Sequence, residues 1–212
     1  MRLAHAGSVD PTDAVNRFSV KVTSLKEARY QSTIRQQYDY SCGSAALATL
    51  LTHHYGDPVT ERMVFDSMYD NGIKAKIRRE GFSLLDIQHY LEARGYRADG
   101  FEVSLDKLIE VGIPAIVLIR DRKYNYFVVI KGIRGNRVLV GDPSRGSRVI
   151  ARADFETLWQ KRIAFLIHNK RENAAFNTAA DWHARQVAPL RDALSRESLA
   201  NITLLRAGRN DF

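Results

Sequence analysis

The chain has 212 residues, of which 45% are hydrophobic, enough for one domain with a full core, alone or with appendages. It has no run of 18 apolar residues, so the sequence predicts no membrane-spanning helix. Lys and Arg (32) outnumber Asp and Glu (24), giving a formal charge of +8, but no basic block is interleaved with aromatic residues. A dedicated nucleic-acid-binding role is therefore not expected.

The N-terminal part carries few structural signals. Residues 1 to about 15 show no periodicity, and alternating Phe18, Val20 and Val22 predict one strand. Ala4-His5-Ala6 fits the small-residue cleavage site of a secretory signal, although the charged and apolar regions that should precede it are missing. From this tripeptide and the family resemblance given below, we expect a periplasmic or exported protein. We interpret residues 1–29 as an N-terminal extension with one strand.

The only cysteine, Cys42, lies where a polar segment gives way to an Ala/Leu-rich helix predicted from about Gly43 to Tyr55. The start of a helix can lower the pKa of a thiol, so Cys42 is a candidate nucleophile. The alternative is a small buried core residue. Gln36, six residues earlier, is close enough to donate its amide to an oxyanion beside the sulfur. Gly43 would leave room for a substrate backbone.

Three more helices are predicted before the sequence changes character. Thr60 caps a helix to about Tyr69, Ser83 with Asp86 caps one that runs to Arg94, and Ser104 begins one that runs to Val111. Between the first two lies Lys74–Gly81, which we interpret as a basic loop. Such loops are usually only solvated, and contact with a substrate is the alternative.

The second half is rich in strands. Apolar runs separated by turn residues predict strands at 113–119, 126–133, 137–140, 148–150 and 163–167, with a short helix at 154–159. Helices followed by an antiparallel meander predict an α+β fold with two facing halves. Residues 169–212 form a polar tail with a candidate amphipathic helix at 181–205. We expect the tail to pack back on the domain, and a partner-docking arm is the alternative.

The segment Gln36-Gln37-Tyr38-Asp39-Tyr40-Ser41-Cys42-Gly43 resembles the catalytic motif of the double-glycine, bacteriocin-processing cysteine peptidases, a papain-like family. It is most similar to their stand-alone branch, which includes the peptidase of functional-amyloid (Fap) secretion. The resemblance covers about residues 30–168. It implies a papain-like fold, with Cys42 as nucleophile and Gln36 as oxyanion donor. The implied substrate is a peptide or protein, a secreted chain with small residues before the cut. The sequence has no metal-ligand cluster and no phosphate-cradling glycine motif, so we expect no cofactor or metal.

The resemblance also places a catalytic histidine, in the pattern His-[Phe/Tyr]-Val-Val, and an Asp before Pro sixteen residues later. Tyr126 stands at the histidine position, and Asp142, before Pro143, stands at the Asp position. Tyrosine, with a pKa near 10, is protonated at neutral pH and is a poor general base. Loss of one triad member typically removes ~10³–10⁶ of the rate, so we predict a nearly inactive chain.

No other histidine is an evident substitute. His53 and His54 lie on the Cys42 helix, roughly 16–18 Å from the cysteine. His89 lies within another predicted helix, and His168 follows the last predicted strand and cannot be placed from the sequence. The remaining two histidines, near the weakly patterned ends, are His5 and His183.

Two accounts of the missing base remain open. The chain is either a natural pseudo-peptidase that binds without cutting or an inactive variant of a working enzyme. We favour the variant, because a long-unused site would be free to lose Gln36 and Cys42. The functional alternative is a non-catalytic module that docks an exported protein near its secretion machinery, and a nucleic-acid-binding protein is a weaker option. The sequence does not give the oligomeric state.

Overall fold

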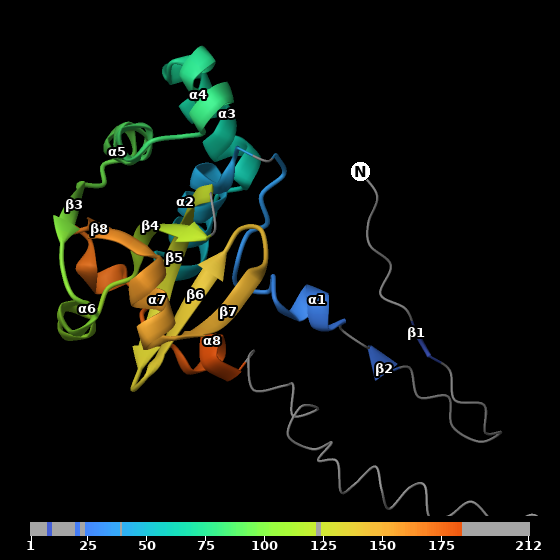
Figure 1. The fold of residues 1–212 in the computed structure, drawn as a ribbon. Coiled ribbons are helices and arrows are strands. Elements are labelled where there is room, and N and C mark those ends of the chain that lie inside the picture. Colours follow the sequence, from blue (N-terminus) through green and yellow to red (C-terminus); the bar gives the residue numbers. More distant parts are fainter. Residues whose placement is uncertain (1–7, 10–19, 22–23, 39, 122–123, 184–212) are drawn as a thin grey trace, which may run out of the picture.

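The computed structural model describes residues 8–9, 20–21, 24–38, 40–121 and 124–183 (Figure 1). The helices are α1 (Leu25–Ala28), α2 (Cys42–His54), α3 (Glu61–Asn71), α4 (Lys74–Glu80), α5 (Leu84–Ala93), α6 (Leu105–Val111), α7 (Arg152–Leu158) and α8 (Ala179–His183), with a 3₁₀ turn at Arg171–Asn173. The strands are β1 (Ser8–Val9), β2 (Val20–Lys21), β3 (Ala98–Glu102), β4 (Ala115–Asp121), β5 (Tyr124–Arg134), β6 (Arg137–Asp142), β7 (Gly146–Ala151) and β8 (Trp159–Ile167).

Six strands form one antiparallel sheet in the order β3-β8-β4-β5-β6-β7. The predicted meander is the continuous part β4 to β7, while β8 returns to pair with β4 on its other side. The pairing of β5 with β6 shifts between Ile130 and Gly132, which marks an irregularity in β5. β1 and β2 pair separately with each other.

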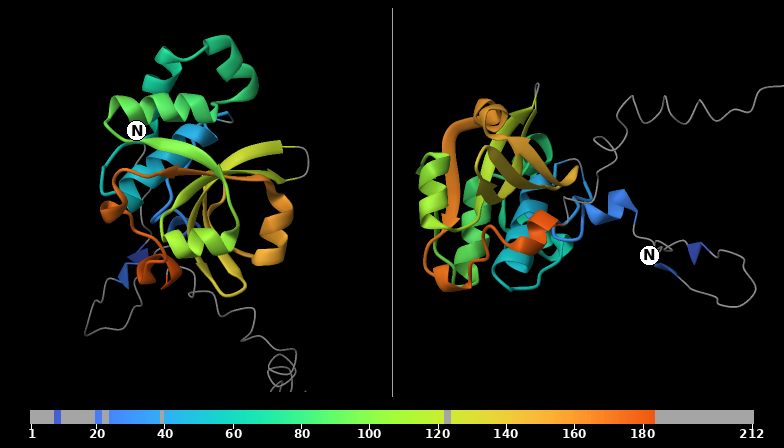
Figure 2. Two further views of the ribbon diagram at one scale, coloured as in Figure 1. Left: turned by 90° about the vertical axis from the view of Figure 1, so that its left-hand side faces the viewer. Right: turned by 90° about the horizontal axis from the view of Figure 1, so that it is seen from below.

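Side chains of the central strands alternate between two cores, because successive residues of a strand point to opposite faces. Val129 joins the core formed with α2, α3 and α5, which includes Leu47 and Leu91. Val128 joins the core formed with α6 and α7, which includes Leu108 and Phe155. The sheet is therefore covered on both faces (Figure 2). α2 packs directly on β5 and is buried along most of its length.

The predicted helix starts are confirmed by their caps. The hydroxyls of Thr60, Ser83 and Ser104 each accept a hydrogen bond from the backbone N–H three residues on, at the starts of α3, α5 and α6. Ser83 and Asp86 form the complete capping box. These boundaries depend on local hydrogen bonds, which explains why the sequence reveals them.

The prediction of a loop at Lys74–Gly81 is wrong. Residues 74–80 form α4, which buries Ile77 and ends at Gly81, where φ is +79°. Lys, Ala, Arg and Glu are all good helix formers, and a single buried side chain suffices to anchor two turns. The strand β3 was not predicted, because only Ala98 of its five residues is buried.

The part of the tail that the structure describes packs on the domain, since Asp181 and Trp182 of α8 are buried. Most of the candidate helix at 181–205 lies outside the described residues, as do Phe18, Val22 and Ala4–Ala6. The division at residues 29 and 168 stays a prediction.

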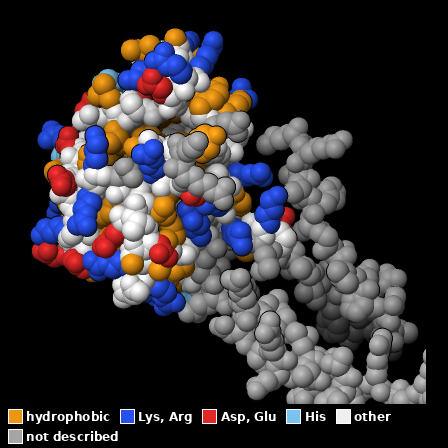
Figure 3. All heavy atoms as spheres, viewed as in Figure 1, with side chains coloured by type: hydrophobic (Ala, Val, Ile, Leu, Met, Phe, Trp, Pro, Cys, Tyr) orange, Lys and Arg blue, Asp and Glu red, His pale blue; other side chains and the backbone are white. Residues whose placement is uncertain are grey.

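Within the described part of the chain, no helix has the length and apolar character needed to cross a bilayer. Figure 3 shows Lys and Arg side chains spread over one face with Asp and Glu among them. Hydrophobic side chains gather in the upper half of that face, where α3, α4 and α5 approach the sheet.

Candidate active site

Cys42 is the first residue of α2 and follows a tight turn. In that turn the Ser41 hydroxyl donates to the Tyr38 carbonyl (3.0 Å) and accepts from the Tyr38 N–H (3.1 Å). Across the molecule, the backbone N–H of Phe127 in β5 lies close enough to the Cys42 sulfur to favour its thiolate form. The first turn of α2 therefore places the thiol against the residue that follows Tyr126.

Burial raises the pKa of the Cys42 thiol. Backbone N–H groups, that of Phe127 foremost, act in the opposite direction, and the charge of Asp142 adds to the rise. The pKa reduction expected at the start of a helix is therefore outweighed by desolvation. In this chain the sulfur is a protonated thiol at neutral pH.

Asp142 ends β6 and is completely buried. One carboxylate oxygen accepts from the Ser144 N–H (2.9 Å), the Ser144 hydroxyl (2.8 Å) and the Arg145 N–H (3.1 Å). The other accepts from Nε of Arg148 in β7 (3.1 Å), whose Nη2 also donates to the hydroxyl of Tyr126 (3.1 Å). Arg148 thus stands between the carboxylate and the position where the resemblance places the base.

The ring of Tyr126 is half-buried in β5. Burial raises the pKa of its hydroxyl, and the charge of Asp142 adds to this. A phenol whose pKa lies above its usual range stays protonated at neutral pH and cannot take a proton from a thiol. The electrostatic environment strengthens the expectation drawn from the residue type.

Gln36 is fixed to the turn that follows Asp142, because its N–H donates to the Pro143 carbonyl (3.1 Å). Its side-chain amide donates to the Tyr38 carbonyl (3.0 Å), and the amide nitrogen carries a second N–H. The three segments that hold Gln36, Cys42 and Tyr126 therefore meet at one place.

That place is a cleft of about 780 Å³ between the helical half and the sheet. Its lining combines the site residues with the end of α4, the start of α5 and β4–β5: Gln36, Tyr40, Cys42, Arg79–Leu84, Leu118, Tyr124–Phe127 and Ser144. Arg79 and Glu80 of the basic segment also line the cleft. The alternative that this segment contacts a substrate stays a prediction. Gly43 lies beneath the cleft, where a Cβ would come within 3.0 Å of Cβ of Phe82, so its role is close packing.

Arg148 is the functional residue that sequence reasoning missed. Its signal was available in the hairpin register, because pairing of Val140 with Arg148 sets Arg148 beside the end of β6. Tyr124 was not predicted as a cleft residue, although it lies two residues from Tyr126. Phe82 lines the cleft next to Ser83, which begins the helix that the resemblance places along it.

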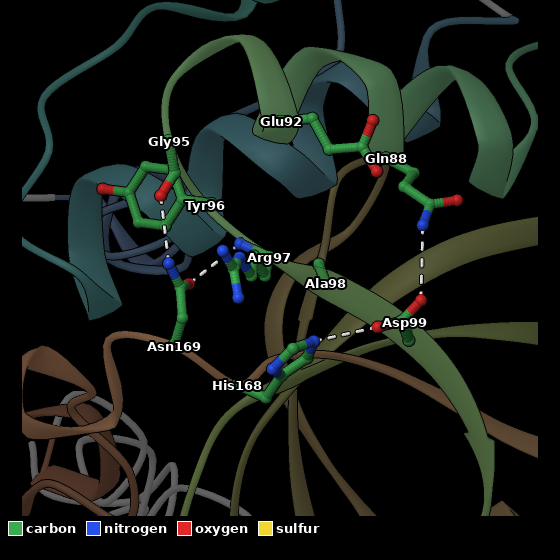
Figure 4. A pocket seen from close by; sticks show the side chains of 9 residues that line it. All are labelled: Gln88, Glu92, Gly95, Tyr96, Arg97, Ala98, Asp99, His168 and Asn169. Carbon is green, nitrogen blue, oxygen red and sulfur yellow. Dashed lines mark hydrogen bonds and ion pairs between the residues drawn. The ribbon is translucent and has the colours of Figure 1, made fainter.

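The histidines that the structure describes do not line this cleft. His168 lines a separate pocket of about 640 Å³, which shares no residue with the cleft (Figure 4). There its Nε2 lies 2.8 Å from Oδ2 of Asp99, whose Oδ1 accepts from Gln88. His54 is buried with Nδ1 2.7 Å from the Ala175 carbonyl. His5 lies outside the described residues.

Among the described residues, no group of three or more His, Cys, Asp or Glu side chains is placed to hold a metal ion. Residues 30–172, more than half of the chain, match the peptidase C39 family. The chain belongs to this family. Both the resemblance to double-glycine peptidases and the predicted α+β papain-like fold are thereby confirmed.

Two C39-like relatives are the probable functional amyloid proteases FapD of Pseudomonas aeruginosa and Pseudomonas fluorescens. Each is 40% identical over 139 residues, which cover 66% of this chain and 62% of the relative. The chain thus matches about three fifths of the length of these relatives.

Solved structures show the same fold. A double-glycine-motif protease from an AMS/PCAT transporter, in complex with its leader peptide, is 25% identical with a TM-score of 0.52, over 63% of this chain and 88% of that chain. The peptidase domain of Streptococcus ComA, a bifunctional ABC transporter involved in quorum sensing, has a TM-score of 0.55 at 18% identity, over 64% and 96%. At that identity the second likeness concerns the fold alone.

Proposed function

We propose that the cleft binds an extended peptide of the double-glycine type beside Cys42, and that this chain hydrolyses it only very slowly. The observation that carries the proposal is that Gln36, Cys42 and Tyr126 line one cleft, with a phenol where a peptidase needs an imidazole. Binding needs only the cleft. Cutting needs a group that takes the thiol proton and returns it to the leaving amine.

The family and the residues that line the cleft support the remaining roles. Cys42 would attack the carbonyl carbon, while the Gln36 amide and the Cys42 backbone N–H would donate to the developing oxyanion. Asp142 would orient an imidazole at position 126, although its Oδ2 accepts a hydrogen bond from Arg148. We therefore propose peptidase machinery that lacks its base.

The proposed partner is a secreted chain with small residues before the scissile bond, handled in the periplasm or outside the cell during functional-amyloid export. The two FapD relatives are probable functional amyloid proteases, and one solved neighbour was captured with a leader peptide. Aromatic rings at Tyr40, Phe82 and Tyr126 line the cleft and would favour a chain without large side chains.

A non-catalytic docking module is the second candidate. The contact of Arg148 with both Asp142 and Tyr126 favours it, because the three side chains form a complete hydrogen-bonded group with no proton acceptor for the thiol. Both candidates require peptide binding in the same cleft.

The lone cysteine makes this binding measurable. A peptide with Gly-Gly before the scissile bond should slow the alkylation of Cys42 by iodoacetamide, measured by mass spectrometry of the whole chain. The matched control is the same peptide with Val-Val in place of Gly-Gly, which should give little protection. Equal alkylation with and without the Gly-Gly peptide would show that the cleft is not its binding site.

A further inference from the structure

The segment 174–183, here called the clasp, hydrogen-bonds to each of the three elements that carry the proposed site. Its first attachment is to α2, the helix of Cys42. The Ala175 N–H donates to the His54 carbonyl (2.7 Å), and Nδ1 of the His54 ring lies 2.7 Å from the Ala175 carbonyl. These bonds fix the clasp at the C-terminal end of α2.

The second attachment is to β5, the strand of Tyr126, at its irregularity. The Asn177 N–H donates to the Lys131 carbonyl (3.0 Å), and the Asn177 side-chain oxygen accepts from the Ile133 N–H (2.8 Å). A Cβ at Gly132 would overlap Asn177 and come within 3.1 Å of Nε1 of Trp182. The glycine therefore lets the clasp approach the strand closely.

The third attachment is to the segment that leads to Gln36, through a buried charge pair. Lys131 is completely buried, and its ammonium group contacts Asp181 of the clasp, the Ser32 carbonyl (2.8 Å) and the Ser32 hydroxyl (2.6 Å). The Ser32 hydroxyl also donates to Asp181 (2.7 Å). Removing one partner of such a pair leaves the other charge buried and uncompensated.

Residues 32–36 form neither helix nor strand, so these contacts hold them in place. Ser32 is bound as described, Thr33 Oγ1 lies 2.6 Å from the Ser147 hydroxyl, and the Ile34 N–H donates to Thr49 in α2 (2.9 Å). Gln36 follows and is bonded to Pro143. The clasp therefore acts at one end of a five-residue segment whose other end carries the amide at the cleft.

We propose that the clasp, through Asp181 and Lys131, positions Gln36 for its interaction with an oxyanion next to Cys42. This inference rests on the proposed function of the cleft. The clasp begins at residue 174, beyond the family match, which ends at 172. The proposed role therefore belongs to a segment outside the peptidase region that the family shares. Asp181 is a positioning residue, since it acts on Gln36 only through Lys131 and Ser32.

A peptide aldehyde ending in Gly-Gly tests this without a catalytic base. The Cys42 sulfur adds to the aldehyde carbon, the C=O double bond becomes a single bond, and the thiol proton ends on the oxygen, which the Gln36 amide can then bind. The dissociation constant of the adduct is measured for the full chain and for Asp181→Asn, Gln36→Ala and the combined variant. Ser32→Ala serves as a milder second probe if Asp181→Asn does not fold.

We expect Asp181→Asn and Gln36→Ala each to weaken the adduct about tenfold, and the combined variant to be no weaker than either, because both remove the same interaction. Ser104→Ala, which removes the cap of α6, controls for lost stability and should leave the dissociation constant within about twofold. An unchanged constant in Asp181→Asn, or two effects that multiply, would overturn the role of the clasp.

Failure of the underlying site would look different. The proposed function fails if the unaltered chain forms no adduct, or if Cys42→Ser forms the adduct equally well. The positioning role is then judged by hydrogen exchange of the Gln36 and Ile34 N–H groups. Asp181→Asn should accelerate both while leaving the α6 N–H groups unchanged, and unaltered exchange of both would reject the clasp.

Discussion

The pH dependence of stability tests how the clasp is packed on α2. His54 is almost completely buried, and Nε2 of its ring has no hydrogen-bond partner among the described residues. Burial, followed by the charge of Lys131, lowers the pKa of His54 from 6.5 to about 4. The imidazole is therefore neutral in the folded protein, and Nδ1–H donates to Ala175.

The sign follows from proton binding. The unfolded chain takes up a proton on His54 as the pH falls below about 6.5, whereas the folded chain resists until about 4. The unfolded state is thus favoured increasingly as the pH falls from about 6.5 to about 4. At 1.36 kcal/mol per pKa unit, a drop from pH 7.5 to pH 4.5 costs on the order of 2 to 3 kcal/mol of unfolding free energy from this residue.

Urea unfolding of the full chain at pH 7.5 and pH 4.5 measures the cost, with His54→Gln as the matched control. Glutamine can donate to the Ala175 carbonyl but does not titrate. His53, whose pKa burial also lowers, contributes to both proteins and cancels in the comparison. The unaltered chain should lose on the order of 2 to 3 kcal/mol more than His54→Gln. Equal losses would refute a buried neutral His54.

Three further predictions concern the cleft and the clasp. Because burial raises the pKa of Cys42, its alkylation rate should still be rising above pH 9, and a plateau below pH 8 would contradict this. In a Tyr126→His background, Arg148→Ala should raise kcat/KM for a Gly-Gly peptide about tenfold, because it frees the Asp142 carboxylate to bind the imidazole. An unchanged rate would show that Arg148 and the imidazole do not compete for this carboxylate. Gly132→Ala should lower the urea-unfolding free energy by about 1–3 kcal/mol through overlap with Asn177, and full stability would show that the clasp can move away.

Local signals made much of the fold predictable. The capping hydroxyls at Thr60, Ser83 and Ser104 depend on neighbours in sequence, and the apolar runs that form β4 to β7 reflect strands buried on both faces. β3 was missed because an edge strand with one buried residue has no apolar pattern. α4 was misread because its charges concealed a short helix held by Ile77 alone.

The site was predictable only where a motif marked it. Cys42 and Gln36 were indicated by their positions as well as by the motif, Tyr126 by the resemblance alone, and the structure brings the three to one cleft. The clasp was not foreseen, because Lys131 lies 50 residues from Asp181 and 99 from Ser32. A lysine within an apolar strand suggests a side chain that reaches solvent, and only the tertiary fold shows it buried in a charge pair.

The most direct test of the account is the rate at which Tyr126→His cleaves a Gly-Gly peptide, relative to the unaltered chain. Tyr126→Phe is the matched control, since it removes the hydroxyl and supplies no base, and Cys42→Ser reports the background. We predict a gain of at least ~10³ in kcat/KM for Tyr126→His and none for Tyr126→Phe. A folded Tyr126→His protein that binds the peptide without cutting it, or an unaltered chain that cuts equally fast through Cys42, would contradict the account.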